Sequence, residues 1–304
     1  MNRIPVLPAL SEAARYRFLL LALTMFLGGP LTVAAEMTPG TATVNGNSLS
    51  SSKKAPSEST ESVEEGIFQR LGRGFSLHKE NYVLPLTWSN IAEGSKDAEL
   101  KFQFSFKQRI FATGFHFAYT QKSFWRILDQ EDSRPFRETN HNPELFYRLA
   151  SRKTAWGYWG GDLGYEHESN GAREPTSRSW DRGYVAPFVE FRRLRAELKL
   201  WYRLSEEVKE DPLDPSGDEN PDIEDFYGYG ELRLVCAPLR RHRAALMLRW
   251  NFATDNGALE LDYSLPTGTP NLFIYAHLWT GYGESLIDYN RSITRYGIGL
   301  QIRQ

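Results

Sequence analysis

Residues 165–182 contain a histidine two positions before a serine, followed by a carboxylate one loop further along. If this stretch is a strand, His167 and Ser169 share one face, because strand side chains alternate between faces. Two strand residues span about 6 to 7 Å, so imidazole and hydroxyl can reach hydrogen-bonding distance. Asp181 can return beside His167 and orient its ring if residues 179–190 form the neighbouring antiparallel strand. This spacing predicts a serine nucleophile with a histidine base. A His-x-Ser pair alone is more often an ordinary polar pair, so its surroundings must decide.

The elements around this motif are predicted to be strands. Beyond residue 98 apolar and polar residues alternate repeatedly, as in Phe102, Phe104 and Phe106, and again in residues 197–202, 259–265 and 272–279. Such alternation is typical of half-buried strands. We count eleven or twelve segments of this kind and expect no amphipathic helix within this region. The sequence therefore predicts an all-β fold.

Two architectures give every strand one apolar and one polar face. A soluble barrel or sandwich hides the apolar face inside, whereas an outer-membrane barrel turns it to lipid. Aromatic residues make up 13% of the chain and recur near strand ends, as interfacial girdles require. The inward faces also carry more charges than a dry core accepts, so the composition favours an antiparallel transmembrane β-barrel. We expect Glu197, Lys199, Arg233 and Arg249 to form a network that fills a narrow lumen.

The first 35 residues have the features of a cleaved signal peptide. Arg3, Arg15 and Arg17 precede an apolar run at 18–27, and residues 33–35 are small enough for cleavage. Residues 36–67 are rich in Ser and Thr without apolar periodicity, and we interpret them as a disordered spacer. The remaining residues, 68–304, form the expected barrel domain. Export followed by a barrel indicates the outer membrane of a Gram-negative cell.

Charge and cysteine content exclude several other classes. The net charge is −2, and residues 1–35 contribute +2 from three Arg and one Glu, so the exported part is near −4. This balance gives no reason to expect a nucleic-acid partner. Cys236 is the single cysteine, so no internal disulfide is possible. The acidic stretch 211–225 could be read as a metal site, but a solvated hairpin loop is the simpler expectation.

Several separated blocks resemble outer membrane phospholipase A, over about residues 68–304. The resemblance is specific, because the His-x-Ser-Asn-Gly run followed by Ser-Arg-Ser-Trp is itself unusual. The matching blocks are residues 75–85, 118–125, 134–146, 165–182, 219–223 and 281–290.

The resemblance implies a twelve-stranded barrel with its catalytic residues on the lipid-facing wall. Members of this family are calcium-dependent hydrolases of phospholipid acyl esters, with phospholipase A1, phospholipase A2 and lysophospholipase activity, and are active as homodimers. Carried over, Ser169 is the nucleophile, His167 the base and later the acid, and Asp181 the third member. The family usually has Asn at the third position. A carboxylate there also stabilises the imidazolium that forms as the serine attacks.

The same resemblance implies the calcium ligands. The catalytic Ca²⁺ would be held by the carbonyls of Ala172 and Ser177, with Ser133 from the partner subunit, and the Gly171 amide would complete the oxyanion site. Glu174 stands where a shorter Asp is usual and would serve a second, weaker calcium site. Gln121 matches a polar residue of the family's dimer interface. The alternative is a barrel without activity that serves as a porin or structural protein.

Overall fold

The computed structural model describes residues 74–91, 98–128, 136–207, 209–211, 214 and 216–304. The predicted signal peptide, spacer and Ser133 lie outside these ranges. Twelve long strands form the wall of the barrel, accompanied by two short pieces, β1 (Phe75–Leu77) and β6 (Arg152–Lys153). The long strands are β2 (Asn81–Ser89), β3 (Glu99–Arg109), β4 (Phe115–Trp125), β5 (Phe136–Arg148), β7 (Tyr158–Ser169), β8 (Ser179–Phe191), β9 (Leu194–Leu204), β10 (Gly230–Cys236), β11 (Arg243–Asn251), β12 (Asn256–Pro266), β13 (Leu272–Gly281) and β14 (Ile293–Ile302).

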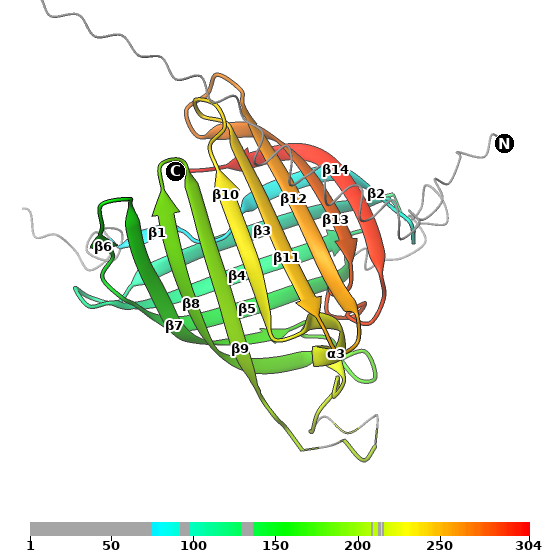
Figure 1. Ribbon diagram of the computed structural model, residues 1–304. Coiled ribbons are helices and arrows are strands. Elements are labelled where there is room, and N and C mark those ends of the chain that lie inside the picture. The colour runs from blue at the N-terminus through cyan, green and yellow to red at the C-terminus, as the bar shows by residue number, and fades with distance from the viewer. Residues whose placement is uncertain (1–73, 92–97, 129–135, 208, 212–213, 215) are drawn as a thin grey trace, which may run out of the picture.

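Every strand pairing in this wall is antiparallel, and the ring is closed by β14 against β2 (Figure 1). The short strand β1 pairs with β3 beyond the end of the β2–β3 pairing, so β1 and β2 together act as one interrupted strand. The short strand β6 extends β5 along β7 in the same way. The predicted all-β, twelve-stranded antiparallel barrel is therefore confirmed. None of the described helices is long and apolar enough to cross a membrane.

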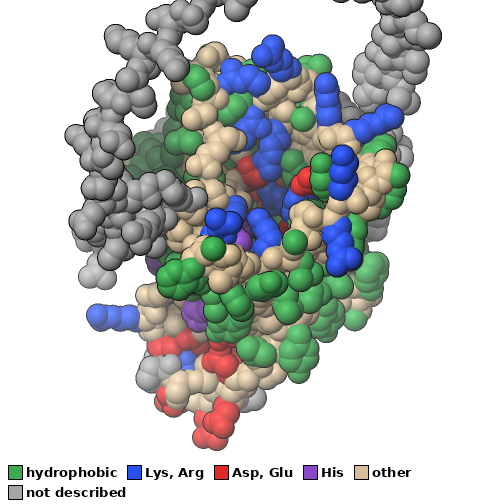
Figure 2. All heavy atoms as spheres, turned by 90° about the vertical axis from the view of Figure 1, so that its left-hand side faces the viewer, with side chains coloured by type: hydrophobic (Ala, Val, Ile, Leu, Met, Phe, Trp, Pro, Cys, Tyr) green, Lys and Arg blue, Asp and Glu red, His purple; other side chains and the backbone are tan. Residues whose placement is uncertain are grey.

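The outer wall is apolar, as the alternating pattern predicts. Leu163 is 59% exposed and Ile298 is 64% exposed, and both point away from the lumen. Figure 2 shows hydrophobic side chains spread over the wall, with basic groups gathered toward its upper end and acidic groups at its lower end. Closure of the sheet leaves no free edge among the twelve long strands, which is the requirement for backbone in a lipid environment.

The lumen is filled by paired charges. Lys79 lies 2.6 Å from Glu144, and Lys199 lies 2.8 Å from Glu166. Arg233 lies 2.9 Å from Glu80, which also binds Arg243 at 2.6 Å. Two more of the predicted inward charges have partners: Glu197 binds Arg195 at 2.7 Å, and Arg249 donates to the carbonyl of Tyr282 at 2.8 Å. With Lys199 and Arg233, all four predicted charges are therefore paired. The expected lumen network is confirmed.

One end of the lumen is covered by a short helix, α3 (Ile223–Tyr227), which follows the acidic segment (Figure 1). Ile223 is fully buried, and the ring of Tyr227 packs edge-on against Trp180 of β8 at 5.0 Å. The expectation of a solvated hairpin at 211–225 is therefore wrong for its second half. Apolar residues within this acidic stretch gain more from packing on the barrel's aromatic residues than from remaining in water. This packing also supports β8 from the lumen side.

Candidate active site on the outer wall

The candidate catalytic residues lie where β7 ends and β8 begins. In the antiparallel pairing of these strands, His167 is directly opposite Asp181 and Ser169 is directly opposite Ser179. The flanking residues Tyr165 and Val185 are exposed, whereas Glu166 and Arg182 are buried in the lumen. All three candidate residues therefore share the outward, lipid-facing side of the wall.

His167 and Asp181 are hydrogen-bonded to each other. Nδ1 of His167 lies 2.9 Å from Oδ1 of Asp181, with 35% and 23% of the two side chains exposed. An ionised carboxylate only accepts, so Nδ1–H is the donor and Nε2 keeps its lone pair. The hydroxyl of Tyr165 donates to the same carboxylate oxygen. This tautomer leaves the ring nitrogen farther from Asp181 able to accept a proton.

Ser169 lies on the same face as His167, two residues further along β7. No hydrogen bond joins these two side chains within the part of the chain that the structure describes. Catalytic hydrogen bonds are often long without substrate and tighten in the reacting complex, so the missing bond does not argue against this pair. The strand supplies the proximity, because consecutive outward positions are about 6 to 7 Å apart.

The loop between the two strands is organised by Asn170. Its Oδ1 accepts from the amides of Ala172 at 3.1 Å and Arg178 at 3.0 Å, and its Nδ2 donates to the carbonyl of Thr176 at 2.9 Å. The next residue, Gly171, has φ 61°, a left-handed conformation that glycine adopts without steric cost. Among the described residues, nothing accepts a hydrogen bond from its N–H. This free amide lies two residues from Ser169.

The same loop carries carbonyl oxygens suited to a hard cation. Within the described residues, no hydrogen bond reaches the carbonyl of Ala172, which leaves that oxygen free to coordinate. The carbonyl of Ser177 accepts from the guanidinium of Arg178 at 2.5 Å, so this cation competes with a metal ion for that oxygen. Calcium binds such backbone oxygens. The carbonyl oxygens of Ala172 and Ser177 are therefore of the type that calcium takes, and only that of Ala172 is free of hydrogen bonds within the described residues. Glu174 instead binds Lys209 at 2.8 Å.

A row of polar side chains crosses the outer wall at the level of Ser169. In the strand register, Gln121 of β4 is opposite His141 of β5, and His141 is opposite Ser169. The hydroxyl of Tyr119 lies 2.6 Å from Nδ1 of His141 and 3.3 Å from Oε1 of Gln121. Sequence reasoning did not identify His141 or Tyr119. Both residues occupy outward-facing positions in the alternating pattern of β4 and β5, and polar residues at such positions were the signal that could have identified them.

Glu206 follows the end of β9 and lies close enough to Asp181 to feel its charge. Partial desolvation raises the pKa of its carboxyl, and the nearby charges of Asp181 and Asp218 raise it further. The pKa of Glu206 therefore lies above its ordinary value beside Asp181. Sequence reasoning also missed this residue, since its proximity depends on the pairing of Asp181 with Leu204.

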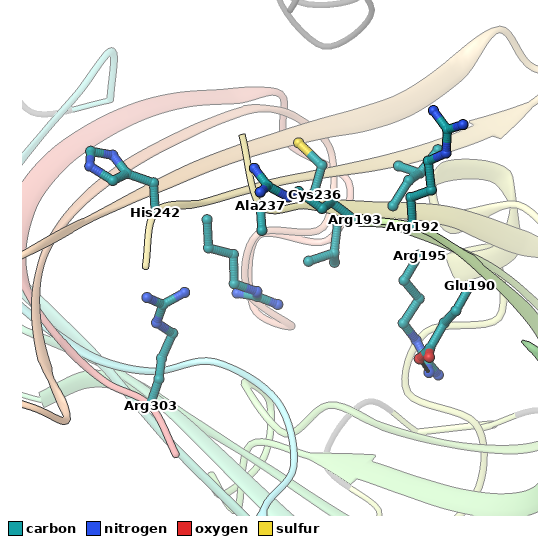
Figure 3. A pocket seen from close by; sticks show the side chains of 11 residues that line it. Glu190, Arg192, Arg193, Arg195, Cys236, Ala237, His242 and Arg303 are labelled. Atoms are coloured by element: carbon teal, nitrogen blue, oxygen red, sulfur yellow. Dashed lines mark hydrogen bonds and ion pairs between the residues drawn. The ribbon is translucent and has the colours of Figure 1, made fainter. Parts of the chain in front are cut away.

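A pocket lies at the opposite end of β8 from the candidate site. This pocket of about 250 Å³ is bordered by Arg192, Arg193 and Arg303, with His242 and Cys236 on its rim (Figure 3). Arg195 at its wall is held by Glu190 at 2.7 Å. Because the whole length of β8 separates it from Asp181, this basic pocket takes no part in the candidate active site.

Comparison with known proteins gives consistent similarities. The model of the family described as Phospholipase A1 matches residues 64–302. Phospholipase A1 of Escherichia coli strain K12 is 35% identical over 223 residues, covering 69% of this chain and 72% of that protein. Phospholipase A1 of Klebsiella pneumoniae is 34% identical over 244 residues, covering 74% and 81%.

Two solved structures share the fold. Outer membrane phospholipase A from Escherichia coli superposes with a TM-score of 0.65 at 31% identity, covering 76% of this chain and 98% of that chain. The outer membrane phospholipase dimer of Salmonella typhi, solved with bound calcium, also gives a TM-score of 0.65 at 31% identity, covering 75% and 91%.

Proposed function

Because this chain belongs to the phospholipase A1 family, we propose that it hydrolyses phospholipid acyl esters in the outer membrane through Ser169, His167 and Asp181. The observation that carries the proposal is the hydrogen bond between His167 and Asp181 on the lipid-facing wall, two residues from Ser169. A site on this face meets acyl chains and ester groups without removing the lipid from the membrane. Phospholipid is therefore the substrate class, and the resemblance to the family implies that either acyl position and lysophospholipids are accepted.

In the proposed reaction, Oγ of Ser169 attacks the ester carbonyl while its proton passes to Nε2 of His167. Asp181 keeps Nδ1–H in place and stabilises the imidazolium with its charge. The N–H of Gly171 donates to the oxyanion of the tetrahedral intermediate. Collapse of this intermediate breaks the ester bond and transfers the proton from His167 to the departing glycerol oxygen. Water, deprotonated by His167, then releases the fatty acid from Ser169.

Calcium would be held by the carbonyls of Ala172 and Ser177, with Ser133 of a second copy, and would add positive charge beside the oxyanion. The support is chemical: the donors are oxygens, and one of them is free of hydrogen bonds. Gly171 lies next to Ala172, so an ion there and the amide would act on the same oxygen. We infer calcium dependence on this basis.

A homodimer would form through the polar row that contains Gln121, His141 and Ser169. Polar side chains on a lipid-facing wall favour a protein partner, because lipid offers them no hydrogen bonds. Gln121 lies two strands from Ser169 in one register row, so an interface centred on it would border the nucleophile. This arrangement would couple activity to association of two copies.

Residues 1–35 would direct export and be removed, and residues 36–67 would link the cleavage point to the barrel in the outer membrane. A porin is the competing function. The ion pairs that fill the lumen, such as Lys199 with Glu166 at 2.8 Å, support an enzyme over a porin, which needs an open channel.

The test is fatty-acid release from phospholipid micelles by the refolded protein, with calcium or with a chelator. We expect release that requires calcium and falls by about 10³-fold or more in Ser169→Ala. Ser179→Ala is the matched control, because Ser179 is the cross-strand neighbour of Ser169 on the same face. Full activity in folded Ser169→Ala would overturn the assignment of the nucleophile. Calcium-independent release would overturn the role of the ion.

A further inference from the structure

Three charged side chains meet between the two loops that border the candidate site. Nζ of Lys209 lies 2.8 Å from Oε1 of Glu174 and 3.9 Å from Oε1 of Glu219. Glu174 belongs to the loop between β7 and β8, whereas Lys209 and Glu219 belong to the segment between β9 and α3. Only 9% of the Lys209 side chain, 16% of Glu174 and 8% of Glu219 are exposed. The contact therefore joins two loops away from bulk water.

Glu219 in particular requires a cation at this position. Its Oε2 is buried and has no hydrogen-bond partner within the described parts of the chain. Its single described ionic partner is Lys209. A buried carboxylate without compensation is strongly unfavourable, so the ammonium is needed to hold it there. Two nearly buried carboxylates that converge from different loops otherwise make a position suited to a hard divalent ion.

We propose that Lys209 is a built-in cation that occupies the position of a second calcium ion between Glu174 and Glu219. Glu174 is then a partner of Lys209 and not a calcium ligand in this protein. The ammonium is a compact point charge on a flexible stem, so it can satisfy both carboxylates without metal. The loop of residues 170–178 is fixed to the neighbouring segment at every calcium concentration.

The consequence for catalysis rests on the proposed function. Glu174 lies between Ala172 and Ser177, the expected calcium ligands, and three residues from Gly171. By holding Glu174, Lys209 acts as a positioning residue for the loop. If the charge of Lys209 is removed, the carboxylates of Glu174 and Glu219 repel one another. The space between them can then be filled by a divalent ion.

Calcium binding to the refolded protein, measured by isothermal titration calorimetry in the Ser169→Ala background, tests the proposal. Lys209→Gln is expected to gain one class of calcium sites, with a dissociation constant of about 10⁻⁴ to 10⁻³ M. The double variant Lys209→Gln with Glu174→Gln should lose the gained class. Lys153→Gln is the control, because this exposed lysine lies in β6 at the other end of the barrel. No gain in Lys209→Gln, or loss of a calcium site in Glu174→Gln alone, would overturn the proposal.

Thermal unfolding gives a second readout. Without calcium, the unfolding midpoint of Lys209→Gln should fall below that of its parent, and added calcium should restore it. Added calcium should not produce this recovery in the double variant or in Lys153→Gln. Neither measurement uses hydrolysis, so an inactive protein would overturn the proposed function and leave this inference to be decided by binding alone. An unchanged unfolding midpoint in Lys209→Gln would contradict the proposal that Lys209 joins the two loops.

Discussion

Nδ1 of His167 donates a hydrogen bond to Oδ1 of Asp181 at 2.9 Å, across directly paired positions of β7 and β8. Both side chains face outward, and the Tyr165 hydroxyl donates to the same oxygen. The carboxylate thus has two donors on a face where an unpaired charge would be costly. This arrangement explains how a carboxylate can stand at this position on the outer wall.

Substitution at residue 181 separates orientation of the ring from stabilisation of its charge. Asp181→Asn retains an oxygen that can accept from Nδ1–H, so we expect substantial residual hydrolysis, well above that of Asp181→Ala. Asp181→Ala removes the acceptor and should lose about 10²- to 10⁴-fold in kcat. Initial rates of fatty-acid release measure both effects. Equal activity in Asp181→Ala and the parent would remove Asp181 from the mechanism.

Gln121→Leu is expected to weaken association of two copies. An amide hydrogen bond between membrane-embedded surfaces contributes about 0.6 to 2 kcal/mol, which corresponds to roughly 3- to 30-fold in the dimer dissociation constant. Analytical ultracentrifugation in detergent with calcium measures this constant. Leu163→Val is the control, because Leu163 is exposed on the same wall but lies outside the polar row. If Gln121→Leu dimerises as tightly as its parent, the interface does not involve this row.

Arg295→Ala is expected to destabilise the barrel strongly. Arg295 is fully buried and binds Glu284 at 2.9 Å, Glu99 at 2.8 Å and the Thr87 hydroxyl at 2.7 Å. Its loss leaves buried carboxylates with fewer cations, at a cost of about 3 to 5 kcal/mol. Urea-dependent folding into lipid vesicles measures the free energy of unfolding. Arg291→Ala is the control, because this side chain is 57% exposed and should change stability little. Similar stability of both variants would contradict a structural lumen network.

Glu206 gives a pH dependence at the edge of the site. Partial desolvation and the charge of Asp181 raise its pKa in the folded protein, so its favourable contribution is present below the ordinary value of 4.5 and is lost as pH rises through the raised value. Glu206→Gln stays neutral and should therefore be more stable than the parent near pH 8 but equal to it near pH 4.

The size of this effect is limited by solvent, because Glu206 is exposed. We expect a difference in the unfolding midpoint on the order of 1 to 2 °C at pH 8, reduced further by salt at about 1 M. Differential scanning calorimetry at the two pH values measures it. A larger advantage of Glu206→Gln at acidic pH would reverse the proposed sign.

The strand pattern was readable from the sequence because each strand has a period of two and one face must meet lipid. That period alone assigns His167 and Ser169 to one face and Glu166 to the other, and the exposures agree. The same reasoning failed for residues 211–225. Their acidic composition indicated solvent, whereas the buried side chain of Ile223 depends on aromatic residues supplied by β8 and β9.

What the sequence determined by itself is therefore local: the alternation, the faces it assigns, and the His-x-Ser spacing. The tertiary structure decided the pairing of Asp181 with His167, the row from Gln121 through His141 to Ser169, and the contact of Lys209 with Glu174. Each of these joins residues on different strands or loops, and a register shift of one position would turn the side chains of a strand to the opposite face. Register is set by packing and closure of the whole barrel, which no short stretch of sequence contains.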